Sequence, residues 1–115
     1  MVAWLARVLR SFGPAFTGIG SALRSQPNLQ VHLVTTLAVT TLGLIQNLPA
    51  WKWGCLGLCI GLVWVAELLN TALEKLCDRI TQERDEQIRQ VKDIAAGAVL
   101  IASAVAVFMA FMIFL

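Results

Sequence analysis

Four polar side chains share one face of a predicted membrane helix, and together they could carry out acid–base or metal chemistry. The segment Ala66–Asp78 (AELLNTALEKLCD) begins inside an apolar run, yet it contains Glu67, Asn70, Glu74 and Asp78. A helix turns by about 100° per residue, so these side chains form a narrow stripe about 16 Å long. Because an ionisable group at bilayer depth costs about 2.5–3.5 kcal/mol to insert, Glu67 indicates a functional site.

Cations lie close to this stripe in the sequence. The last apolar run is preceded by Lys92 and Asp93, and Arg7 and Arg10 lie near the N-terminus. Carboxylates and an amide beside cations suit magnesium and phosphate together. Phosphoryl transfer needs mainly positioning and charge neutralisation. Glu67, the deepest carboxylate, could accept a proton from a lipid alcohol. The sequence has no GxxxxGK(S/T) loop, so a nucleotide site here would be unconventional.

The composition indicates an integral membrane protein. The chain has 115 residues and is 58% hydrophobic, whereas roughly 45–50% is usual for soluble domains. So short a chain cannot bury that much apolar surface in its own core, so lipid must cover much of it. The net charge of only +2 predicts no nucleic-acid partner. We interpret Cys55, Cys59 and Cys77 as reduced, packed thiols.

The hydropathy pattern predicts an all-α fold with a single domain over residues 1–115. Apolar runs predict three transmembrane spans at about 29–46, 51–76 and 92–115. Before them, residues 4–24 have apolar side chains at helical spacing on one face, which predicts an amphipathic helix at the membrane surface. The alternative is a helix that docks on the bundle, and Pro14 would kink or divide it. Gly57 and Gly61 form a GxxxG pair that predicts close helix packing.

The basic residues predict the orientation. Three basic residues precede the first span: Arg7, Arg10 and Arg24. Five lie between the second span and the third: Lys75, Arg79, Arg84, Arg89 and Lys92. The turn between the first and second spans contains only Lys52. The positive-inside rule then places the N-terminus and the 75–92 segment in the cytoplasm. Three spans put the C-terminus outside, so the acidic stripe opens toward the cytoplasm.

Each of these residues also has a purely structural interpretation. Asp78, Lys92 and Asp93 could equally be solvated charges at the ends of spans. His32, near the start of the first span, is more often a hydrogen-bonded interfacial residue than a ligand in such a position.

Three segments resemble one protein family. Residues 66–78 are similar to the signature E-x-x-N-(S/T)-A-x-E-x-x-x-D of the prokaryotic diacylglycerol kinases. Lys92-Asp93 and the following IAAGAVL resemble that family's second motif, and Asn28–His32 (NLQVH) resembles the N-(F/L)-x-(I/V)-H motif of its undecaprenol kinase branch. Order and spacing agree over essentially the whole chain.

The resemblance implies a homotrimeric enzyme of the bacterial inner membrane. It would transfer the γ-phosphoryl group of MgATP to the hydroxyl of a lipid alcohol, diacylglycerol or undecaprenol, at a site near the cytoplasmic face. By this resemblance Glu67 is the catalytic base, Glu74 binds Mg²⁺, and Glu67 and Ala96 contact the lipid substrate. The nucleotide-binding positions implied are Arg7, Asn70, Glu74, Asp78, Glu83, Arg84, Asp85, Lys92 and Asp93.

Two positions depart from the family pattern. Gln26 stands where the family often has a glutamate that binds a further metal ion. An amide oxygen can still bind a cation, but it brings no charge, so the metal count and affinity would change. Pro14 stands where the family has an aromatic nucleotide contact.

Two other functions are compatible with the same residues. A small proton-coupled transporter would explain Glu67, but not why Glu74, Asp78, Lys92 and Asp93 gather at one end of the spans. A non-catalytic, degenerate kinase subunit is supported only by Gln26.

Overall fold

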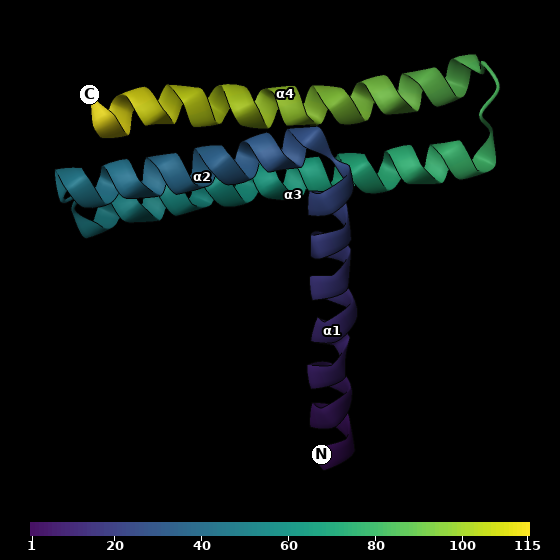
Figure 1. Ribbon diagram of the computed structural model, residues 1–115, viewed down its shortest axis with the longest axis horizontal. Coiled ribbons are helices and arrows are strands. Elements are labelled where there is room, and N and C mark those ends of the chain that lie inside the picture. The colour runs from purple at the N-terminus through teal and green to yellow at the C-terminus, as the bar shows by residue number, and fades with distance from the viewer.

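The computed structural model describes all residues from 1 to 115 and consists of four helices (Figure 1). In chain order these are α1 (Val2–Ser25), α2 (Pro27–Gln46), α3 (Ala50–Ile80) and α4 (Glu86–Phe114). The helices α2, α3 and α4 lie side by side, with α3 antiparallel to both neighbours, whereas α1 leaves this bundle and points away from it (Figure 1). The all-helical prediction is confirmed.

Three of the helices are long and apolar enough to cross a membrane. With 20 residues, α2 is about 30 Å long at 1.5 Å per residue, which matches the hydrocarbon core of a bilayer. The helices α3 and α4 have 31 and 29 residues. The three predicted spans are therefore present, but α3 continues past residue 76 to Ile80 and α4 already begins at Glu86. Only residues 81–85 connect them.

The extra length of α3 and α4 lies at one end of the bundle. A short turn joins the end of α2 to the start of α3, so the two helices are level at this end of the bundle. At the opposite end, α3 continues past the first turn of α2 (Figure 1). The contact between His32 and Glu67 shows where α2 begins against α3. Beyond Glu67, α3 continues for about 20 Å at 1.5 Å per residue. The polar stripe therefore runs along the part of α3 that α2 does not accompany.

Residues 2–25 form one uninterrupted helix, so Pro14 does not divide it. Its one buried residue is Ala22, near the junction with α2. There Gln26 caps both helices: its N–H donates to the carbonyl of Ala22, and its own carbonyl accepts from the N–H groups of Leu29 and Gln30. The remainder of α1 projects away from the bundle, so docking on the bundle of its own protomer does not explain this helix (Figure 1).

Most side chains of the protomer are exposed. Only 12 of 115 residues are buried, and large apolar side chains are exposed along every helix. A soluble chain does not tolerate apolar exposure on this scale, so lipid or other protein chains must cover these faces. The most extensive packing joins α3 to α4, where Ala95 and Ala102 are buried. No atom would contact a Cβ added at Gly57 or Gly61, so the GxxxG pair is not used within the protomer.

The turn between α2 and α3 is closely packed. Asn47 ends α2 in the left-handed conformation at φ 54°, which asparagine tolerates better than most residues. Gly43 lies beneath the Trp53 ring, and a Cβ at this position would come within 2.8 Å of the ring. At the same end, Lys52 Nζ donates a 2.9 Å hydrogen bond to the carbonyl of Ile113 and ties α3 to the end of α4.

Candidate functional site

The carboxylate of Glu67 is buried inside the bundle, where α1, α2 and α3 meet. Only 2% of this residue is exposed. Its one polar partner is His32 of α2, whose Nε2 lies 3.5 Å from Glu67 Oε2. That distance is longer than an ordinary N–H···O hydrogen bond. The structure therefore confines an acid next to an imidazole and leaves the second carboxylate oxygen without a polar partner.

A second polar contact between α2 and α3 lies one turn away. Trp64 Nε1 donates a 2.9 Å hydrogen bond to Thr36 Oγ1, and the same hydroxyl donates a 2.7 Å bond to the carbonyl of His32. Residues 32 and 36 of α2 thus face residues 67 and 64 of α3. These contacts fix the register of the two helices, and the register brings His32 to Glu67.

Asn70 and Glu74 offer oxygen atoms one and two turns beyond Glu67. Asn70 Nδ2 donates to Glu74 Oε1 at 3.4 Å, while the Asn70 Oδ1 atom is buried without a hydrogen-bond partner. The hydroxyl of Thr71 is also buried without a partner. An unpaired buried acceptor is costly, so Asn70 Oδ1 fits a site that a cation or another donor completes.

Asp78 and Lys92 join the stripe to the start of α4. Lys92 Nζ donates a 2.7 Å hydrogen bond to Asp78 Oδ1. The apolar stretch of α4 begins at Ile94, so Lys92 lies outside it. The hydrogen bond to Asp78, with a smaller contribution from the charge of Glu74, raises the pKa of the Lys92 ammonium. Lys92 is therefore a fixed positive charge beside the carboxylates of α3.

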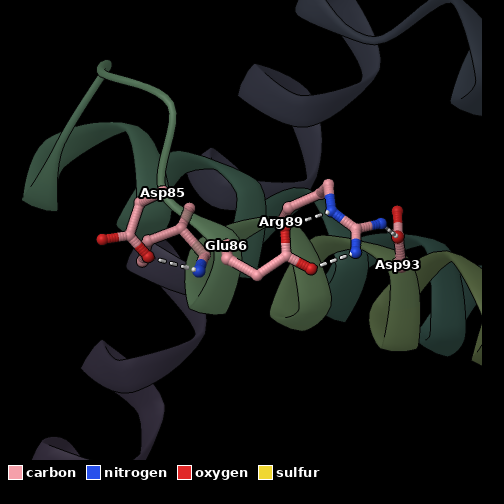
Figure 2. Close-up of polar contacts among 5 residues, drawn as sticks. Asp85, Glu86, Arg89 and Asp93 are labelled. Carbon is pink, nitrogen blue, oxygen red and sulfur yellow. Dashed lines mark hydrogen bonds and ion pairs between the residues drawn. The ribbon is translucent and has the colours of Figure 1, made fainter.

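Asp93 faces a different partner. Figure 2 shows the Arg89 guanidinium between the carboxylates of Glu86 and Asp93, with 2.8 Å from Arg89 Nη1 to Asp93 Oδ2. The hydrogen bond from Arg89 lowers the pKa of the Glu86 carboxyl. Asp85 accepts a 3.0 Å bond from the N–H of Ile88 and caps α4 (Figure 2). Asp93 and Asp85 are thus engaged within α4 itself.

Other predicted site residues form no hydrogen bond or ion pair with this cluster within one protomer. Arg7 is exposed and about 27 Å along α1 from the end that meets the bundle, at 1.5 Å per residue. Glu83 and Arg84 are exposed in the 81–85 connection, and Ala96 is exposed on α4. Gln26 is half-buried at the α1–α2 junction, and its side chain makes no hydrogen bond. No three Asp, Glu, His or Cys side chains converge as a ready metal site.

An intramembrane cavity of about 260 Å³ lies between α2, α3 and α4. Its lining is mainly apolar, and the four polar residues in it are His32, Thr35, Thr36 and Ser103. His32 lines this cavity and also contacts Glu67. The polar lining of the cavity therefore lies next to the buried acid at His32.

The contact of His32 with Glu67 is the feature that the sequence did not predict. Spacing within a single helix reveals which residues share its face, but it does not reveal which residue of another helix lies opposite. The sequence did contain one signal, the histidine of the Asn28–His32 motif.

The sequence of this chain matches one known family. The model of the family described as prokaryotic diacylglycerol kinase matches residues 13–114. The undecaprenol kinase of Bacillus subtilis is 35% identical over 111 residues, which cover 96% of this chain and 90% of that protein. The diacylglycerol kinase of Synechocystis is 41% identical over 101 residues, which cover 87% of this chain but 58% of that protein.

A third relative is the diacylglycerol kinase of Escherichia coli, 30% identical over 101 residues, which cover 88% of this chain and 83% of that protein. The matched region includes the three spanning helices and the stripe on α3. This chain therefore belongs to the prokaryotic diacylglycerol kinase family of lipid kinases.

Proposed function

We propose that this protein transfers the γ-phosphoryl group of MgATP to the hydroxyl of a membrane lipid alcohol, either undecaprenol or diacylglycerol. The single observation that carries the proposal is the position of Glu67. Its carboxylate is buried next to a residue that lines the intramembrane cavity, and it begins a polar stripe that ends at the Asp78–Lys92 pair. A lipid hydroxyl and a nucleotide phosphate would meet at such a position.

Each end of the site has its own part in the proposed reaction. The apolar chain of the lipid lies in the cavity, with its hydroxyl at Glu67. The carboxylate accepts the hydroxyl proton as the oxygen attacks the γ-phosphorus, and the bond from that phosphorus to the bridging oxygen of ADP breaks. Lys92, at the other end of the stripe, would offset the charge of the nucleotide phosphates.

The oxygen atoms of Asn70 and Glu74 fit Mg²⁺, which takes one or two carboxylates together with phosphate oxygens and water. Asn70 Oδ1 is buried and unpartnered, and it lies in the residue that hydrogen-bonds Glu74. When bound, Mg²⁺ would bridge phosphate oxygens and offset their charge. Gln26 would be a neutral second ligand at the α1–α2 junction.

We also propose the placement of the protein in its membrane. The end of the bundle that carries Arg24, Lys75, Arg79 and Lys92 faces the cytoplasm, because basic residues favour that side. In the bacterial inner membrane, α1 then lies along the cytoplasmic surface, and the C-terminus lies outside. Three protomers assemble and cover the exposed apolar faces of the helices.

The test is phosphorylation of defined lipids by the purified protein in micelles with MgATP. We expect labelled phosphate on undecaprenol or diacylglycerol, and each is offered separately. The variant Glu67→Gln should lose activity about 10²–10⁴-fold, as expected when a general base is removed. The matched control Glu86→Gln changes an exposed glutamate in the same way and should remain active. Full activity of Glu67→Gln would remove Glu67 from the mechanism.

A further inference from the structure

We infer that His32 is a positioning residue for the catalytic base: its imidazole on α2 holds the Glu67 carboxylate in the orientation that accepts the proton of the lipid hydroxyl. This inference rests on the proposed function, because it concerns the reaction at Glu67. It adds a residue that neither the acidic stripe nor the family signature on α3 contains.

The surroundings of Glu67 single out His32. The carboxylate forms no side-chain hydrogen bond, and its one polar contact is Nε2 of His32 at 3.5 Å. The nearest acid on α3 is Glu74, which accepts a hydrogen bond from Asn70. On α4 the nearest charged groups, Lys92 and Asp93, are engaged with Asp78 and Arg89. No other charged side chain is therefore in contact with the buried carboxylate.

The position of His32 is itself held by the fold. Its carbonyl accepts a hydrogen bond from the Thr36 hydroxyl, and this hydroxyl accepts a hydrogen bond from the indole N–H of Trp64 on α3. These bonds prevent α2 from sliding along α3 next to the imidazole. Its side chain is 20% exposed, whereas that of Glu67 is 2% exposed, so the histidine contacts both the buried acid and the cavity that it lines.

The geometry assigns a different part to each oxygen of Glu67. His32 Nε2 lies 3.5 Å from Oε2, which leaves Oε1 to accept the proton of the lipid hydroxyl. The 3.5 Å distance can shorten when substrate enters, because catalytic hydrogen bonds are often long in the free enzyme. Without the imidazole the carboxylate can rotate away, and a misplacement of about 1 Å can cost 10²-fold in rate.

The test compares two substitutions at this position. His32→Leu removes the N–H donor, whereas His32→Gln keeps one. We expect kcat to fall about 10- to 100-fold in His32→Leu, while the KM for ATP stays within about twofold of that of the unmodified protein. His32→Gln should retain most of the original kcat. The control Thr41→Val removes a side-chain hydroxyl from another turn of α2 and should match the unmodified protein.

A second measurement does not depend on activity. An apolar carbodiimide reacts with the protonated form of a buried carboxyl group, and mass spectrometry locates the adduct. Without the imidazole the Glu67 carboxyl group is no longer held in one orientation, so it should be labelled about threefold faster or more in His32→Leu than in the unmodified protein. His32→Gln should be labelled at nearly the original rate, and Glu67→Gln gives the background.

The outcomes separate the two proposals. If the unmodified protein phosphorylates no lipid alcohol, the proposed function fails, while the labelling still decides whether His32 holds Glu67. If the protein is active and His32→Leu keeps full kcat, or if both His32 variants lose kcat equally, the positioning role is wrong. Equal labelling of Glu67 in His32→Leu and in the unmodified protein would also overturn it.

Discussion

Lys92 and Asp78 form a hydrogen-bonded ion pair that stability alone does not explain. Both side chains are more than a third exposed, and exposed pairs of this kind contribute little to folding. The pair does, however, hold a permanent positive charge next to the carboxylates of α3. We therefore expect Lys92 to matter more for the reaction than for the fold.

The first prediction concerns Lys92. Lys92→Met should reduce kcat about 10²–10³-fold, the usual cost of removing one group that stabilises developing charge. The melting temperature in micelles should hardly change, because the lost pair is exposed. Lys75→Met, which removes an exposed lysine with no ion pair from the same end of α3, is the matched control. Equal activity of the two variants would exclude Lys92 from the site.

At the residue scale, the sequence predicted the acidic stripe well but not all the partners of its members. Glu67, Asn70, Glu74 and Asp78 share one face because helical spacing alone determines it. Lys92 donates a hydrogen bond to Asp78 across the two helices, a pairing that the sequence did not specify. Asp93, in contrast, pairs with Arg89 four residues earlier, since residues four apart are neighbours on the same face of a helix.

At the scale of helices, the number of long apolar helices was predicted correctly, and α3 and α4 extend beyond the predicted spans. Hydropathy marks where a run of apolar side chains ends, whereas a helix ends where its backbone hydrogen bonds end. α4 begins six residues before the predicted span because Asp85 caps it and Arg89 bridges Glu86 and Asp93. These local polar contacts stabilise a helix that hydropathy does not detect.

The second prediction separates two roles of Asp85, the cap of α4 and a nucleotide-binding residue. Asp85→Ala should destabilise the start of α4 by about 0.5–2 kcal/mol, the cost of losing an N-cap. Asp85→Ser restores the cap without the charge. If capping is the whole role, the Ser variant should match the unmodified protein in both thermal stability and KM for ATP. A raised KM for ATP in Asp85→Ser alone would point to a direct contact with nucleotide.

The third prediction concerns the packing between α2 and α3. A Cβ at Gly43 would lie 2.8 Å from the Trp53 ring, so Gly43→Ala must displace the indole and should destabilise the protein by about 1–3 kcal/mol. Gly18→Ala, where no atom lies within 4 Å, should be neutral or slightly stabilising. Thermal unfolding in micelles measures both changes. Equal stability of the two variants would show that Trp53 can move freely.

At the scale of the whole molecule, the fold of a single protomer does not bring all the predicted site residues together. Arg7 lies far along α1, and α1 points away from the helices that carry Glu67 and Lys92 (Figure 1). The sequence could not reveal this, because the direction in which α1 leaves the bundle depends on the junction at Gln26. If Arg7 contacts nucleotide, it must therefore reach the site of a neighbouring protomer.

The fourth prediction tests this arrangement by mixing subunits. Arg7→Ala and Glu67→Gln protomers are each expected to be inactive alone. In a closed ring with one shared site per contact, random 1:1 mixing should restore about a quarter of the sites, because a complete site needs one intact residue from each of two neighbours. Coexpressed variants, purified as the whole population of mixed and unmixed oligomers, measure this recovery against each variant alone.

The control for this experiment is a residue that already lies beside Glu67 in the same protomer. Asn70→Ala should not be rescued by Glu67→Gln, because the two residues are one turn apart on α3 and an intact site needs both from one chain. If Arg7→Ala is likewise not rescued, Arg7 acts within its own protomer and α1 must bend back toward the bundle. If Arg7→Ala is fully active alone, Arg7 is not part of the nucleotide site.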